Sequence, residues 1–326
     1  MKPRFKKLII IFLILMIGVA GFFFFKGKRT ISIITENGAL FSPKTDGRWD
    51  ILLLGNRGDN AKGGGFLTDS IMVLSYRPKT GDLALISIPR DLWVKIPNYS
   101  PQRINAVYGI GKHKNRGDVS EGLGLAKEVV SNVTGLDIDF AVVADIEALR
   151  DIVNTLGGIT VYEQKSFYSD FYGYKVNIKK GMNQLTGSQA LAYVGIRDID
   201  SDFGRMERQQ KVLLAIKEKA FSLDFISNPK KVLGMLDALG KHLRTDLDSE
   251  QLEYLVKRLP KLEINSTNKI TIDNTNYLYS SRSSAGAYIL LPNEGNFDEI
   301  QEVCKYPFLD EESSMIKEDS AKKINN

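Results

Sequence analysis

A short apolar run, Asp82–Asp91, sets the strongest limit on the fold of this chain. Its continuous run of apolar residues, some of them β-branched, predicts a buried strand, and Pro89 ends that strand because proline cannot donate a hydrogen bond to a sheet. Arg90 and Asp91 then follow at the carboxyl end of the strand, where α/β sheets bind ligands. Two interpretations are open: a functional pair of opposite charges, or a surface ion pair at the entry of a loop.

The segments around this run predict an α/β fold. Asp50–Leu54 and Ile71–Tyr76 have the composition of strands, and the turn signals after the second predict an antiparallel hairpin with the run at Asp82. Arg103–Gly111 predicts a helix. The helix expected over Ile146–Leu156 carries one apolar stripe and follows a capping residue, Asp145.

The amino terminus predicts a membrane anchor. Leu8–Phe25 is uncharged and mostly apolar, about 27 Å long as a helix at ~1.5 Å per residue, which suffices to span a bilayer core. The basic flank Lys2–Lys7 favours a cytoplasmic amino terminus, so residues 1–7 are assigned to the cytoplasm. A cleaved signal peptide is the alternative, but no small-residue cleavage site follows the run. We therefore expect a single-pass protein of the cell membrane with its main domain outside the cytoplasm.

Charge and composition exclude several classes of protein. The formal net charge is +5, but the first 29 residues hold seven basic and no acidic residues, so the remainder carries −2. We therefore expect no nucleic acid as a partner. Cys304 is the only cysteine, which rules out an intrachain disulfide, and the two histidines are too few for a histidine-based metal cluster. Residues 26–48 are predicted to be a linker, 49–308 one catalytic domain, and 309–326 a disordered charged tail.

An anion site is predicted at a helix that begins at Asp202. Arg205, Arg208 and Gln209 lie on one face of this helix at spacings of three and four residues, and the face becomes apolar one turn later. Such arginines point into a crevice rather than to solvent, and Arg197 lies just before the helix. Clustered guanidinium groups near a helix amino terminus suit phosphate.

Carboxylates near these arginines extend the predicted chemistry. Asp69 precedes the second strand and Asp91 follows the third, while Asp59 lies in a glycine-rich loop. Carboxylates beside phosphate oxygens suit Mg²⁺, with Mn²⁺ as an alternative. Metal-assisted phosphoryl transfer therefore fits better than acyl transfer, and a lipid-linked phosphate is the natural substrate at a membrane surface. The aromatic segment Phe167–Tyr174 is expected to form a hairpin that either lines an apolar groove or packs on the core.

The chain resembles the LytR-CpsA-Psr family of cell-wall glycopolymer ligases. The resemblance spans about residues 50–219 and rests on motifs that occur in the family's order: Ile51-Leu-Leu-Leu-Gly55, Thr68-Asp-Ser-Ile-Met72, Ser87-Ile-Pro-Arg-Asp91, Arg103-Ile-Asn-Ala-Val-Tyr108, Ala190-Leu-Ala-Tyr193 and Asp202-Phe-Gly-Arg-Met-Glu-Arg-Gln-Gln210. It implies an α/β/α sandwich with a mixed central sheet behind one transmembrane helix. It also implies an apolar tunnel for a polyprenyl chain, with the pyrophosphate bound at its mouth by arginine and Mg²⁺.

The resemblance also implies roles for individual residues, carried over by motif position. Asp69 corresponds to a metal ligand. Arg90, Arg197 and Arg205 correspond to phosphate-binding, catalytic arginines, with Asp91 as the catalytic motif neighbour of the first. Arg208 and Gln209 correspond to the arginine–glutamine pair of the motif helix, where Gln209 has packing as an alternative role.

Three positions depart from the family pattern. The family often has Gly-x-Asp after the first strand, whereas Gly55 is followed here by Asn56 and Arg57, which leaves Asp59 as the candidate substitute for the metal ligand. Leu67 replaces an arginine two residues before Asp69. Gly195 replaces the first arginine of the later pair.

The implied reaction moves a glycopolymer phosphate from a polyprenyl-pyrophosphate carrier to a peptidoglycan hydroxyl. Two alternatives stay open: a hydrolase that uses water as the acceptor at the same site, and a non-catalytic module that binds lipid or cell wall. The three departures motivate the last alternative.

Overall fold

The computed structural model describes residues 47–58, 66–114, 117–171, 173–196, 202–220, 240–248, 251 and 264–308. The predicted membrane span 8–25, the predicted tail 309–326, Asp59 and Arg197 lie outside these residues. None of the helices within the described ranges combines the length and the hydropathy needed to cross a bilayer.

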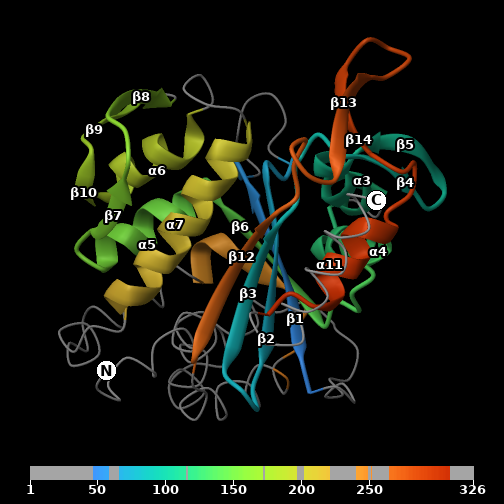
Figure 1. Cartoon of the computed structure of the whole chain (residues 1–326), viewed down its shortest axis with the longest axis horizontal. Coiled ribbons are helices and arrows are strands. Elements are labelled where there is room, and N and C mark those ends of the chain that lie inside the picture. Colours follow the sequence, from blue (N-terminus) through green and yellow to red (C-terminus); the bar gives the residue numbers. More distant parts are fainter. Residues whose placement is uncertain are drawn as a thin grey trace, which may run out of the picture.

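A six-stranded mixed sheet forms the centre of the protein (Figure 1). Its strand order is β11-β6-β1-β2-β3-β12, and β1, β3, β6 and β12 run in one direction while β2 and β11 run in the other. The strands span Trp49–Asn56 (β1), Ser70–Arg77 (β2), Asp82–Ser87 (β3), Phe140–Asp145 (β6), Leu243–Thr245 (β11) and Ser266–Thr271 (β12). The expected α/β fold with a mixed central sheet is confirmed.

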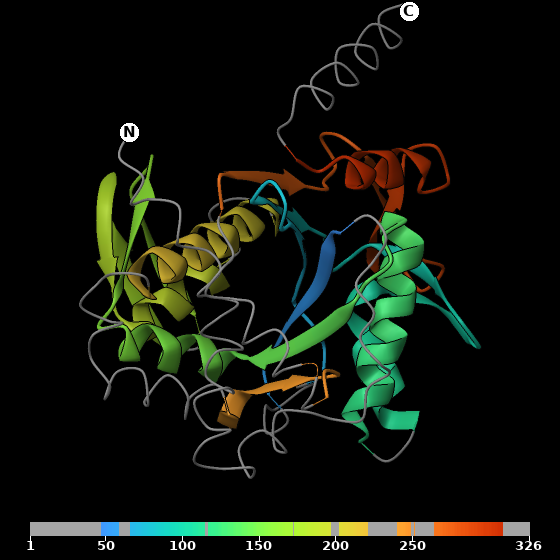
Figure 2. The same ribbon diagram turned by 90° about the horizontal axis from the view of Figure 1, so that it is seen from below.

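The sheet separates two hydrophobic cores. Successive side chains of a strand point to opposite faces, and in β1 Ile51 belongs to one core while Leu52 belongs to the other. One face packs against α5, α6 and α7, and the other against α3, α4 and α11, as Figure 2 shows from below. The helices span Val107–Lys114 (α3), Val119–Thr134 (α4), Ile146–Thr155 (α5), Gly187–Gly195 (α6), Asp202–Ala220 (α7) and Asp298–Lys305 (α11).

The run from Asp82 forms the buried strand that its sequence predicts. Its residues after Asp82 are buried, and the strand ends at Ser87, two residues before Pro89. Strand β3 pairs antiparallel with β2 in the predicted hairpin. Asp145 caps α5 as expected, since its side chain accepts a hydrogen bond from the backbone N–H of Ala148 at 2.9 Å.

One predicted helix begins later than expected. Arg103 lies at the end of a strand, where it pairs with Trp93, and helical backbone begins only at Ile104 with the short 3₁₀ helix η2 (Ile104–Ala106). The prediction over Arg103–Gly111 is therefore wrong at its start, because cross-strand pairing holds Arg103 in an extended conformation.

In the described part of the chain, four two-stranded sheets surround the central layers, and three of them are hairpins. The aromatic segment forms one of them, as predicted, and it lies beside α6. The strands of these small sheets span Trp93–Ile96 (β4), Tyr99–Arg103 (β5), Ile159–Glu163 (β7), Phe167–Phe171 (β8), Tyr174–Ile178 (β9), Gly181–Leu185 (β10), Leu278–Arg282 (β13) and Tyr288–Pro292 (β14).

Candidate functional site

One edge of the sheet gathers polar residues from four strands. Because β1, β3 and β6 are parallel, their carboxyl ends lie at the same edge as the start of the antiparallel β2. Gly55 of β1 pairs with Ser70 of β2, and Asn56 pairs with Asp145 of β6. This edge is where α/β sheets bind ligands.

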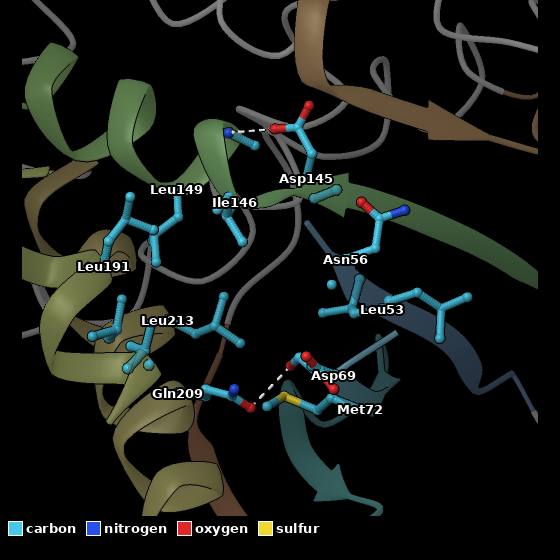
Figure 3. A pocket seen from close by; sticks show the side chains of 18 of the residues that line it. Leu53, Asn56, Asp69, Met72, Asp145, Ile146, Leu149, Leu191, Gln209 and Leu213 are labelled. Carbon is cyan, nitrogen blue, oxygen red and sulfur yellow. Dashed lines mark hydrogen bonds between the residues drawn. The ribbon is translucent and has the colours of Figure 1, made fainter. Parts of the chain in front are cut away.

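A large cavity opens beside this edge, between the sheet and helices α5, α6 and α7. Its empty volume, counted out to the open mouth, is about 1190 Å³. Figure 3 shows leucines of the three helices facing Leu53 and Met72 of the strands across the cavity. Most of its wall is aliphatic: Leu53, Leu54, Met72, Val142, Ile146, Leu149, Ile152, Leu191, Val194, Val212, Leu213, Ile216 and Leu243. The polar wall residues are Asn56, Arg57, Asp69, Ser70, Asp145, Arg205 and Gln209.

Asp69 is held by three arginines at the cavity mouth. Its Oδ1 accepts a hydrogen bond from Arg90 at 2.9 Å, and its Oδ2 accepts one from Arg57 at 3.4 Å. Its backbone carbonyl accepts a third from Arg205 at 2.9 Å. The side chains of Asp69 and Arg90 are each 17% exposed, so these charges lie at a partly buried surface that a ligand can reach.

Asp91 forms a second charged pair behind the first. Its two oxygens lie 3.5 Å from Nε of Arg90 and 3.0 Å from a terminal nitrogen of Arg103. Arg90 and Asp91 therefore belong to one network rather than to an isolated surface pair. Neither residue is part of the cavity wall, and Asp91 acts on the mouth through Arg90.

The first turns of α7 bring two predicted residues to the mouth and direct a third elsewhere. Arg205 and Gln209 are part of the cavity wall, and the Gln209 side chain accepts a hydrogen bond from the Ser70 hydroxyl at 3.0 Å. Arg208 is 2% exposed and donates to the backbone carbonyls of Tyr193 and Ile196 at 2.9 and 2.7 Å. These carbonyls belong to the end of α6, where helix carbonyls lack intrahelical partners. Arg208 thus supports the site from behind, and its contact with phosphate stays a prediction.

One histidine, His242, contacts two aspartates at the opposite side of the mouth. Asp145 is part of the cavity wall, and its Oδ2 lies 2.9 Å from Nδ1 of His242. The other ring nitrogen of His242 lies 3.4 Å from Asp151. These contacts tie the residue just before β11 to the cap and the middle of α5.

The described residues do not fit a magnesium ion held by Asp69. Magnesium requires closely spaced oxygen ligands, usually one or two carboxylates beside substrate phosphates. Both oxygens of Asp69 instead contact guanidinium nitrogens, which carry positive charge. Within the described ranges, no three Asp, Glu, His or Cys side chains gather as a metal site would need. Asp59, the other predicted ligand, lies outside those ranges, so the metal roles of both residues remain predictions.

The aromatic hairpin both lines the cavity and packs on the core, the two roles that were expected as alternatives. Phe171 is part of the cavity wall, whereas Phe167 and Tyr174 pack against the core. Phe171 also lies over Gly195, where an added Cβ would come within 2.3 Å of the ring. The glycine at this position is therefore required by close packing.

A partly buried ion pair outside the cavity wall connects β7 to helices α6 and α7. The Glu163 carboxylate accepts hydrogen bonds from the Tyr193 hydroxyl and from the Lys211 ammonium, the latter at 2.9 Å. Burial by itself raises the pKa of Glu163, but these hydrogen bonds and the charge of Lys211 outweigh it, and the net pKa lies below its usual value of 4.5.

This lowered pKa predicts an acid-sensitive contribution to stability. A carboxyl group whose pKa is lowered by folding stabilises the folded state above its unfolded pKa, and this stability is lost as the pH falls through its folded pKa. We expect the free energy of unfolding, measured in urea, to fall below about pH 4.5, and Glu163→Gln to make that decline shallower. An unchanged decline in Glu163→Gln would assign the acid sensitivity to other carboxylates.

The site combines predicted residues with others that the sequence did not single out. The structure brings Asp69, Arg90, Asp91, Arg205 and Gln209 together, while Arg197 and Asp59 lie outside the described residues. Arg103 joins the Asp91 network, and Asp145 with His242 forms a separate contact at the other side of the mouth. Asp145 carried a signal as the expected cap of a helix, and Arg103 as the first residue of a family motif, whereas His242 carried none.

Comparison with known proteins agrees with this geometry. The model of the LytR_cpsA_psr family matches residues 26–305. Over 211 residues the chain is 31% identical to the polyisoprenyl-teichoic acid–peptidoglycan teichoic acid transferase TagU of Enterococcus faecalis, covering 64% of each protein. Over 212 residues it is 32% identical to TagU of Oceanobacillus iheyensis, covering 64% of this chain and 61% of that protein. The matches thus span just under two thirds of the length of these relatives.

Solved structures share the fold. TagT bound to LIIa-WTA superimposes with a TM-score of 0.61 at 26% identity, covering 83% of this chain and 94% of that one. TagV of B. subtilis superimposes with a TM-score of 0.60 at 25% identity, covering 80% and 97%. The similarity therefore extends over most of the described sheet and helices.

Proposed function

Since the chain belongs to the LytR-CpsA-Psr family, we propose that it is a phosphotransferase that moves a glycopolymer from a polyprenyl-pyrophosphate carrier to a hydroxyl of peptidoglycan. The observation that carries this proposal is a mostly aliphatic cavity with a cluster of arginines at its mouth. Few substrates combine a hydrocarbon chain with adjacent phosphates, and a lipid pyrophosphate does.

The cavity walls account for the lipid part of the substrate. Burial of hydrocarbon is favourable by roughly 0.8 kcal/mol per CH₂ group, and most of the cavity wall between the sheet and α5, α6 and α7 is aliphatic. A water-soluble sugar nucleotide would gain nothing from such a wall. The proposed membrane helix at residues 8–25 would keep the mouth close to the lipid carrier.

The arginines account for the phosphate part. In the proposed reaction, the acceptor hydroxyl oxygen forms a bond to the phosphorus that carries the glycan, and the bond from this phosphorus to the bridging oxygen breaks. The polyprenyl phosphate leaves with the electron pair of that bond, and the hydroxyl proton passes to it or to water. Arg57, Arg90 and Arg205 are positioned to neutralise the charge of the phosphates as the bond breaks.

The names of relatives support a cell-wall acceptor. The TagU proteins are named as transferases of teichoic acid to peptidoglycan. We propose the same class of acceptor here, together with an extracytoplasmic location. Because the sequence predicts a role for Mg²⁺, activity is to be measured both with and without this ion.

The test uses the full chain in lipid nanodiscs with a synthetic polyprenyl-pyrophosphate saccharide and peptidoglycan, with and without Mg²⁺. We expect consumption of the lipid and saccharide phosphate attached to peptidoglycan, both detected by mass spectrometry. Release of free saccharide phosphate alone would favour a hydrolase. Binding without consumption would favour a non-catalytic module, and either outcome would contradict transfer.

A bulky side chain in the cavity should weaken binding of long lipids. Leu213 of α7 faces the cavity, whereas its neighbour Leu214 does not line it, so Leu213→Trp and Leu214→Trp form a matched pair (Figure 3). We expect Leu213→Trp to lower the affinity for a long polyprenyl pyrophosphate about tenfold. A tenfold loss corresponds to ~1.4 kcal/mol, which is less than the burial of two CH₂ groups contributes. Affinity for inorganic pyrophosphate should stay unchanged. Equal losses in both variants would argue against the cavity as the lipid site.

A further inference from the structure

We propose that Arg57 takes the place of a divalent cation at the cavity mouth, so that lipid pyrophosphate binds without Mg²⁺. This inference rests on the proposed function, because it concerns how the same site holds its pyrophosphate. It differs from the expectation drawn from sequence, in which carboxylates hold a metal ion that in turn holds the phosphates.

The first observation is that Asp69 is occupied by guanidinium groups. Arg57 lies 3.4 Å from one carboxylate oxygen and Arg90 lies 2.9 Å from the other. A divalent cation at Asp69 would need to displace at least one guanidinium and would then face the repulsion of both. Asp69 thus holds two arginines at the mouth. On binding, phosphate oxygens of the substrate would take the place of the Asp69 carboxylate as partners of these arginines.

The second observation is that the other carboxylates of the mouth are also engaged. Asp91 contacts Arg90 and Arg103. Asp145 accepts from the backbone of α5 and contacts His242. The carboxylates described at this edge are thus paired with side-chain cations or backbone donors, which is the pattern of an anion site rather than of a magnesium site.

The third observation is that the backbone fixes Arg57 at this place. The backbone N–H of Gly58 donates to the Asn56 side chain at 2.8 Å, and Gly58 has a φ of 87°, which favours glycine. A Cβ at Gly58 would come within 3.3 Å of Asp145. The chain therefore turns tightly after β1, and Arg57 is part of the cavity wall with its side chain 25% exposed.

Guanidinium chemistry suits this substitution. Arginine stays charged at any physiological pH and presents a planar fork of donors that matches phosphate oxygens. Three such groups surround Asp69: Arg57 and Arg90 from the segments that follow β1 and β3, and Arg205 from α7. Together they supply positive charge from different directions. In metal-dependent phosphoryl transfer, a bridging cation neutralises the phosphate charge in this way.

The test measures binding of farnesyl pyrophosphate to the full chain in detergent micelles by calorimetry, in EDTA and in MgCl₂. We expect affinities that differ by less than about twofold between the two conditions, since arginine supplies the charge that metal would supply. An affinity that is lost in EDTA and restored by Mg²⁺ would overturn this inference and leave the proposed function intact. Absence of binding in both conditions would overturn both.

Variants at Arg57 make the test sharper. Arg57→Ala should lose roughly 10- to 150-fold in affinity in both conditions, the fold-change that corresponds to one charge-assisted contact. Arg57→Asp supplies a carboxylate beside Asp69 and should bind weakly in EDTA but recover on addition of Mg²⁺. Arg57→Lys keeps the charge without the fork and should fall between wild type and Arg57→Ala.

A direct metal probe provides a readout that does not depend on the lipid. Titration with Mn²⁺, followed by electron paramagnetic resonance, should show binding to Arg57→Asp and none at this site in the wild type. Binding of Mn²⁺ to the wild type that Asp59→Ala removes would contradict the inference and assign Asp59 as a metal ligand. Thermal unfolding of each variant checks that the fold is retained.

Discussion

Arg90→Ala is expected to abolish consumption of the lipid carrier. Arg90 contacts both Asp69 and Asp91, at 2.9 and 3.5 Å. Its loss removes a charge-assisted contact to the pyrophosphate, roughly 1.5–3 kcal/mol or about 10- to 150-fold in affinity. It also leaves two carboxylates that repel the incoming phosphates. We expect the rate of lipid consumption, followed by mass spectrometry, to fall by more than the affinity does.

Two further variants distinguish chemistry from folding. Arg90→Lys keeps the charge but loses the planar fork, so partial activity is expected. Arg77→Ala is the matched control, since Arg77 lies at the far end of β2, contacts Asp82 and stacks on Phe308. Full activity of Arg90→Ala, or an equal loss in both alanine variants, would remove Arg90 from the catalytic machinery.

The strands and helices of the centre could be predicted because local signals agree with the global fold. The run after Asp82 is apolar on both faces, as a strand buried between two helical layers must be. Asp145 precedes an apolar stripe and caps α5 as such residues do. In both cases the residues that fix the local structure are the same ones that pack the core.

The hairpin of β4 and β5 could not be predicted for the opposite reason, although the aromatic hairpin could. Strand β5 from Tyr99 to Gln102 is exposed and has no apolar alternation, so its conformation depends on pairing with β4. Arg103 looked like the start of a helix because its own pairing with Trp93 is invisible in the sequence.

In the candidate site, too, some residues could be predicted from local sequence and others depend on tertiary contacts. Arg90 and Asp91 could be anticipated from the strand that ends before them, and Arg205 from the face of its helix. The direction of Arg208 could not, because it depends on where α6 ends and leaves the carbonyls of Tyr193 and Ile196 to be satisfied. The interaction of Arg57 with Asp69 likewise depends on the approach of two strand ends.

Restoring a side chain at Gly195 is expected to destabilise the protein. The family pattern places an arginine here, yet a Cβ at this position would lie 2.3 Å from Cγ of Phe171 and 2.5 Å from Cδ1. No real Cβ contact is so short, so the ring must move into the cavity or α6 must shift. Overpacking of this kind costs typically 1–3 kcal/mol. Gly195→Ala should therefore lower the melting temperature by roughly 2–4 °C per kcal/mol, and Gly195→Arg by more.

A double-mutant cycle tests whether the ring is the cause. In a Phe171→Ala background the clash is gone, so Gly195→Ala should cost less than about 0.5 kcal/mol there, and the two changes should show strong coupling. Gly124→Ala is the control, since Gly124 lies in α4 and an added Cβ meets nothing within 4 Å. That variant should gain roughly 0.5–1 kcal/mol through helix propensity. An unchanged melting temperature of Gly195→Ala would mean that the ring yields freely, and the arginine of the family pattern could then be restored without cost.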